Sequence, residues 1–241
     1  LEPGAITTRL SPSFVRFGNF EILAASGETE NLKKLVDYTI TSHFPALATG
    51  LGTDEGYAAW FLEVAARTAN LMVEWLRVGF VHGVMNTDNM SILGITIDYG
   101  PYGWLDVYDP GFTPNTTDAT HKRYRYAQQP SIGLWNLARL AEALAPLVND
   151  PVQLEHAFDT FRQTFSQGYQ AMMAADDTRP VSADSALAGT SANGSYTNIT
   201  ANNFSAIEHY PGGLGVYTEQ VTASTTRPFG VGEYIWPKDQ T

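Results

Sequence analysis

The stretch from residue 81 to residue 111 most limits what this chain can fold into. It sets short runs of isoleucine and leucine between glycines, and glycine or proline marks both of its ends. Apolar residues that alternate around Gly94 predict a loop, a short β-hairpin and a second loop. Such a hairpin would hold Asp88 and Asn89 on one side and Asp98 on the other.

Those three polar residues suggest a metal site. An amide and a carboxylate brought together across a hairpin offer only oxygen ligands, and Mg²⁺ takes few protein ligands, so that phosphate oxygens find room beside them. Asp98 on its own reads as an ordinary turn aspartate. With Asn89 nine residues earlier, we predict that the two bind Mg²⁺ or Mn²⁺. Asp88 could instead serve only to cap the hairpin that follows it.

The spacing also matches the catalytic half of a protein kinase. His82 and Asn89 stand seven residues apart, as in the kinase motif H-R-D-x-x-x-x-N, and Asp98 begins an Asp-Tyr-Gly in the place of D-F-G. The kinase base position, however, is Val84, which cannot accept a proton. Asp88 stands directly before the asparagine instead, so ordinary kinase chemistry is not expected. We expect His82 to be structural and to support the backbone near Asp98.

Longer motifs point to one family. HGVMNTDNMSILGITIDYGP, DPGFTPNTTD, RYRYAQQP, IGLWNLARLAEAL and the upstream RLSPSFVRFGNFE closely resemble the selenoprotein O (SelO) family of protein adenylyltransferases. The resemblance covers residues 1 to about 175. It implies a kinase-like fold, in proteins once taken for pseudokinases, and Mg-ATP-dependent transfer of AMP to Ser, Thr or Tyr hydroxyls of proteins. The chain departs from the family at His121 and Lys122, where glycine is usual.

The resemblance also assigns roles to residues. It makes Asp88 the base that takes the proton of the target hydroxyl. It makes Arg9 and Arg16 the arginines that grip the terminal phosphate of ATP, which this family binds reversed relative to kinases. A planar guanidinium suits phosphate because it donates two parallel hydrogen bonds. The alternative is two surface arginines. The implied location is the cytoplasm of a bacterium or the mitochondrion of a eukaryote.

Composition narrows the choice of partners. The net charge is −11, and no basic run is longer than the three residues that start at His121. Nucleic acids and anionic membranes are bound through clustered Lys and Arg, so neither is expected as a partner. The chain has no cysteine, which excludes disulfides and zinc-thiolate sites. ATP and proteins with hydroxyl acceptors are the partners that we predict.

The expected fold class is α+β. We predict a mostly helical, kinase-like C-lobe over residues 1–176, with the β-hairpin as its catalytic centre, and a β-rich segment over residues 177–241. Apolar periodicity and end signals predict helices over residues 29–44, 54–78, 130–147 and from 151 onward, after strand and turn over residues 1–20. Asp106 and Asp109 are expected to shape a loop through hydrogen bonds to backbone amides.

The last part of the chain keeps other functions open. After Asp177 the sequence is rich in Ser, Thr, Asn and Gly and does not resemble the family. RPFGVGEYIWP weakly resembles a barrel strand of retaining glycosidases, which makes Glu233 a candidate nucleophile and a glycoside hydrolase fragment an alternative. An inactive nucleotide-binding or scaffolding remnant is another. If the kinase resemblance holds, an N-terminal lobe should precede Leu1, and the chain alone should be weak or inactive.

Overall fold

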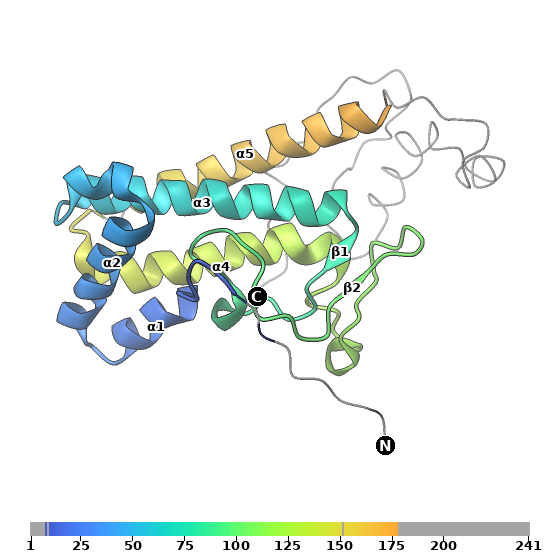
Figure 1. Ribbon diagram of the computed structural model, residues 1–241, viewed down its shortest axis with the longest axis horizontal. Coiled ribbons are helices and arrows are strands. Elements are labelled where there is room, and N and C mark those ends of the chain that lie inside the picture. Colours follow the sequence, from blue (N-terminus) through green and yellow to red (C-terminus); the bar gives the residue numbers. More distant parts are fainter. Residues whose placement is uncertain (1–7, 9, 151, 178–241) are drawn as a thin grey trace.

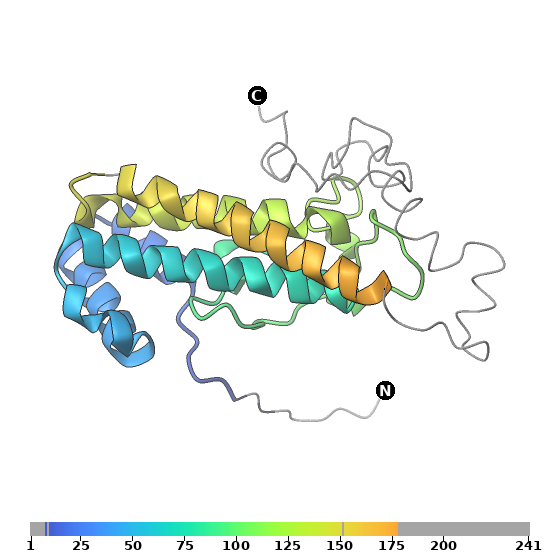
Figure 2. The ribbon, with the colours of Figure 1, turned by 90° about the horizontal axis from the view of Figure 1, so that it is seen from above.

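The computed structural model describes residues 8, 10–150 and 152–177 (Figures 1 and 2). Arg9, Glu233 and residues 178–241 of the segment predicted to be β-rich lie outside these residues, and Asp177 is the last residue of a helix. The described part is mostly helical and contains one two-stranded antiparallel sheet, in agreement with the α+β class. Its helices and strands are α1 (Phe17–Ala25), α2 (Thr29–His43), α3 (Asp54–Arg77), β1 (Phe80–Val81), β2 (Gly103–Trp104), α4 (Gln129–Leu144) and α5 (Val152–Asp177).

Helix α3 is the centre of the fold. The Thr53 hydroxyl accepts a hydrogen bond from the Gly56 N–H (3.1 Å), and two acidic residues in the first turn suit the positive end of the helix dipole. The helix ends before Gly79, which has the positive φ (68°) common after a helix. Both views show α5 running along α3, with α4 on another side (Figures 1 and 2). Trp60 and Phe61 of α3 are completely buried in the core between the helices.

The four predicted helices are confirmed, with their bounds shifted by a few residues. The region 130–147 divides into α4 and a short 3-10 helix, Ala145–Leu147. The start of α5 follows the Asp150 side chain, which accepts a hydrogen bond from the Val152 N–H (3.1 Å). No helix in the described part of the chain is both long enough and apolar enough to cross a membrane.

Helix α1 was not predicted, and the expectation of strand and turn up to residue 20 is wrong from Phe17 onward. A nine-residue helix with a glycine at its second position has little apolar periodicity to reveal it. Tertiary packing stabilises it instead. Phe17 and Phe20 are completely buried, and the Phe20 ring centroid lies 5.6 Å from that of Trp60.

The predicted hairpin is shorter than expected. It is a tight turn at Gly94 (φ 67°), closed by a single antiparallel bridge between Met90 and Thr96. A Cβ on Gly94 would lie 2.7 Å from Cβ of Arg67, so the turn packs directly on α3. The two-stranded sheet is formed instead by β1, which precedes the turn in sequence, and β2, which follows it. The central stretch is therefore fixed by the helix beneath it rather than by its own ladder.

Candidate functional site

The predicted site residues come from three segments of the chain. Asp88 and Asn89 lie on the 3-10 turn η2 (Thr87–Asn89), Asp98 lies after the turn at Gly94, and Arg16 directly precedes α1. Backbone hydrogen bonds join the segments, from the Phe17 N–H to the Met90 carbonyl and from the Ile92 N–H to the Val15 carbonyl, both 3.0 Å. The start of α1 is thereby fixed against the strip that carries the predicted ligands.

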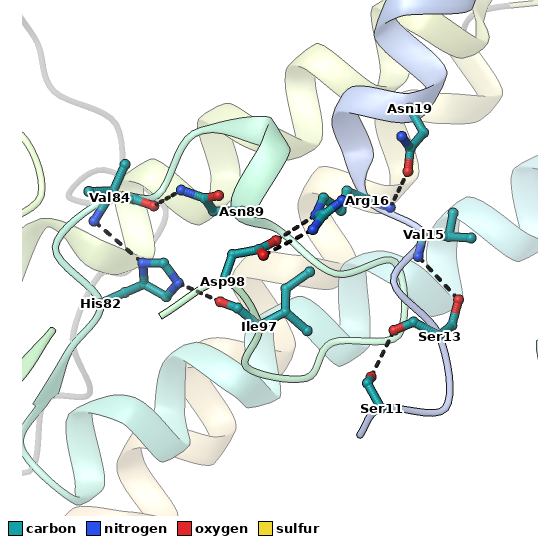
Figure 3. A network of polar contacts seen from close by, with 10 residues as sticks. All are labelled: Ser11, Ser13, Val15, Arg16, Asn19, His82, Val84, Asn89, Ile97 and Asp98. Carbon is teal, nitrogen blue, oxygen red and sulfur yellow. Dashed lines mark hydrogen bonds and ion pairs between the residues drawn. The ribbon is translucent and has the colours of Figure 1, made fainter. Parts of the chain in front are cut away.

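Arg16 and Asp98 form a two-pronged ion pair (Figure 3). The Arg16 Nε lies 2.5 Å from the Asp98 Oδ2, and its Nη2 lies 2.9 Å from Oδ1. The hydrogen bond to Asp98 raises the pKa of Arg16. Both side chains remain about 30% exposed, at 31% and 29%. From the sequence, Arg16 is assigned to a phosphate of ATP and Asp98 to a metal ion, whereas the structure shows the two side chains paired with each other.

The backbone at Asp98 is unusual. Its φ is 51°, in the left-handed region that non-glycine residues occupy rarely, although aspartate tolerates it better than most. Such conformations cost energy and persist where the surroundings hold them, often at functional sites. Here the Arg16 pair holds the side chain, and the preceding carbonyl, that of Ile97, is held by His82.

His82 has the structural role that its place in the motif predicts. The ring is completely buried, with Nε2 2.9 Å from the Ile97 carbonyl oxygen and Nδ1 3.4 Å from the Val84 backbone nitrogen. This geometry fits the neutral form in which Nε2–H donates to Ile97 and Nδ1 accepts from the Val84 N–H. Burial lowers the pKa of His82. A buried neutral imidazole that is engaged on both sides is not a base for an external hydroxyl.

The pKa of His82 predicts a pH dependence of stability. Below about pH 6.5 the unfolded chain binds a proton at this residue more readily than the folded chain, whose His82 pKa is lowered, so acid favours unfolding by up to about 1.4 kcal/mol per pH unit. Urea unfolding of the wild type should show this loss as the pH falls, and His82→Gln should show a flatter slope. An NMR titration in which the folded His82 ring protonates at or above its ordinary pKa would contradict the prediction.

Two further polar side chains hold the His82 loop, and sequence reasoning missed both. Gln129 is completely buried at the start of α4, where its Oε1 accepts from the His82 N–H (3.0 Å) and its Nε2 donates to the Phe80 carbonyl (2.9 Å). Asn115 donates to the Gly83 carbonyl (3.0 Å). The available signal was the polar Gln pair in RYRYAQQP, immediately before an apolar helix.

Of the two described aspartates expected to shape a loop, Asp109 makes the expected hydrogen bond to a backbone amide, whereas Asp106 makes none within the described part of the chain. The Asp109 carboxylate accepts a hydrogen bond from the Gly111 N–H (2.8 Å), as expected of a residue that shapes a turn. Lys122, one of the two residues at which the resemblance led us to expect glycine, has a left-handed backbone with φ 49°. Lys122 thus has a backbone conformation that is less favourable for lysine than for glycine.

The side-chain oxygens of Asn89 and Asp98 are of the type that would suit a magnesium ion. The Asn89 side chain donates its N–H to the Val84 carbonyl (2.8 Å), which leaves the amide oxygen for a cation (Figure 3). Asp98 adds a carboxylate, and two protein oxygens are typical for Mg²⁺. The residues that the structure describes contain no cluster of three or more His, Asp or Glu side chains suited to a metal. Arg16 occupies the Asp98 carboxylate that the ion would need.

Comparison with known proteins agrees with the motifs. The model of the family described as protein adenylyltransferase SelO matches residues 1–176. A protein nucleotidyltransferase YdiU from Nitrosospira multiformis is 60% identical over 174 residues, which cover 72% of this chain and 31% of the relative. Proteins of the same name from Xanthomonas axonopodis pv. citri and Xanthomonas campestris pv. campestris are 60% and 58% identical over 165 and 164 residues. The chain thus spans about a third of the length of these relatives.

Proposed function

Because the chain belongs to the SelO family of protein adenylyltransferases, we propose that it carries the catalytic residues for AMP transfer from Mg-ATP to Ser, Thr or Tyr hydroxyls of proteins. In this reaction the hydroxyl oxygen attacks the α-phosphorus, pyrophosphate leaves, and the hydroxyl proton passes to a base. Since the chain spans about a third of its relatives, the activity is proposed for a protein that contains it, with ATP and hydroxyl-bearing proteins as substrates.

The single observation that carries the proposal is the meeting of Arg16 with Asp98, 82 residues further along the chain, beside the turn that bears Asp88 and Asn89. Asn89 and Asp98 would hold Mg²⁺, which supplies positive charge to the phosphate oxygens. Asp88 would accept the proton, and Arg16 would bind a phosphate of the nucleotide. Arg9, which lies outside the described residues, is proposed as the second phosphate ligand on the family pattern alone.

The Arg16–Asp98 pair agrees with these roles if nucleotide binding separates it. The Arg16 guanidinium gives Asp98 a positively charged partner, as a magnesium ion would, and the Asp98 carboxylate gives Arg16 a negatively charged partner, as a phosphate would. Mg-ATP carries both charges and can therefore replace each partner of the pair. The two side chains are about 30% exposed, so the exchange requires no opening of the core.

Replacing Arg16 with glutamine tests this assignment. Loss of a charged hydrogen-bond donor to phosphate costs about 1.5–3 kcal/mol, so calorimetry should show Mg-ATP binding about 10- to 100-fold weaker. Mn²⁺ alone should bind no more weakly than to the wild type, because Asp98 is released. Arg162→Gln, which removes an equal charge from an exposed pair on α5, is the control. Unchanged affinity for Mg-ATP in Arg16→Gln would mean that Arg16 is not a phosphate ligand.

A further inference from the structure

Gly18 lies against the carboxylate of Asp88. It is the second residue of α1 and is buried. A Cβ placed on Gly18 would lie only 2.1 Å from the Asp88 Oδ1 and 3.2 Å from its Cγ. No pair of non-bonded heavy atoms tolerates 2.1 Å, so any residue with a side chain would displace the carboxylate.

Space, rather than backbone conformation, explains the glycine. Gly18 is not among the glycines with positive φ, so another residue could adopt its conformation. Glycine inside a helix is also less stable than alanine because the unfolded chain has more freedom to lose. Glycine therefore lowers the stability of the helix at this position, but it leaves the space that the Asp88 side chain occupies.

The surroundings leave one way to relieve a clash. The backbones on either side are fixed, by the bond from the Phe17 N–H to the Met90 carbonyl (3.0 Å) and by the bond from the Asn89 N–H to the Asn86 carbonyl (3.0 Å). The nearest backbone atom, the Asp88 Cα, lies at an ordinary 3.4 Å from the added Cβ. Only the Asp88 side chain would have to turn.

We propose that Gly18 is a positioning residue that fixes the direction of the Asp88 carboxylate. The bare backbone at the start of α1 lets the carboxylate lie beside the positive end of the helix, which favours a negative charge there. The inference rests on the proposed function, since it takes Asp88 as the proton acceptor. Gly18 itself touches neither nucleotide nor target in this account; it acts through Asp88.

A double-mutant cycle tests the contact without any assay of activity. The four proteins are the wild type, Gly18→Ala, Asp88→Ala and the double variant. In the Asp88→Ala background, the alanine at position 18 should raise Tm by about 2–4 °C, because only the helix preference remains. In the wild-type background the gain should be absent or reversed. Equal shifts in both backgrounds would show that the carboxylate does not lie on Gly18 and would overturn the inference.

The positioning role needs a second readout, in the full-length Nitrosospira multiformis relative. With residues 1–176 of this chain in place of the matching third of that relative, Gly18→Ala should lower kcat for transfer of α-labelled AMP at least about 10-fold and leave KM for ATP unchanged, since misplacement by 1 Å can cost about 100-fold. A coupled stability cycle with an unchanged kcat would make the contact merely structural and overturn the positioning role. Absence of α-label transfer by the unmodified relative would instead overturn the proposed function.

Discussion

Replacing Asp98 with asparagine is expected to abolish metal-dependent nucleotide binding while the chain stays folded. Asparagine keeps the size of the side chain and tolerates the left-handed backbone at this position, where φ is 51°. It removes the carboxylate charge, which we propose binds Mg²⁺ and which pairs with Arg16 in this structure. Because Asp98 is proposed to bind the Mg²⁺ ion that in turn binds the phosphates, the affinity for Mg-ATP should fall by more than about 100-fold.

Calorimetric titration with Mg-ATP measures this effect, and thermal unfolding shows whether the fold is kept. Asp109→Asn is the matched control, since it removes the same charge from a loop where the side chain accepts one backbone hydrogen bond that an asparagine oxygen can also accept. Wild-type affinity in Asp98→Asn would place the metal site elsewhere in the molecule. Loss of the unfolding transition would instead show that the ion pair with Arg16 is needed for folding.

The helices could be predicted because their apolar residues recur at helical spacing and their ends carry caps. In α3 the Thr53 cap and Gly79 mark the two ends, and both are visible in the sequence. Helix α1 could not be predicted in this way. It is short, and it is held by packing against α4 and by the contact of Phe20 with Trp60 of α3, both of which are distant in sequence. The hairpin was overestimated because Gly94 packs on α3 instead of extending a ladder.

The candidate site could be predicted only in part, for a related reason. The spacing of His82, Asn89 and Asp98 is local and readable, and His82 has the structural role expected of it. Contacts between distant segments leave no such pattern. The pairing of Arg16 with Asp98 and the approach of Gly18 to Asp88 depend on how residues 15–17 lie along residues 90–92, which is a property of the folded chain alone.

The second large effect concerns the chain by itself. We expect the 241 residues to transfer AMP at least about 100-fold more slowly than the full-length Nitrosospira multiformis relative, of which they span 31%. Phosphoryl-transfer folds act mainly by positioning the nucleotide and neutralising its charge, and loss of one such contact typically costs about 100-fold. Initial rates with α-labelled ATP and one acceptor protein give the comparison. Equal rates would show that the matched third contains the whole catalytic apparatus.

The most direct test of the central claim is to follow which phosphate of ATP reaches the acceptor. The chain at high concentration and the full-length relative are each incubated with Mg²⁺, a hydroxyl-bearing protein and ATP labelled at either the α or the γ position. Our account predicts label on the acceptor from α-labelled ATP only, with none when Asp88 or its counterpart in the relative is changed to asparagine. Transfer from γ-labelled ATP alone would show a protein kinase and contradict the account.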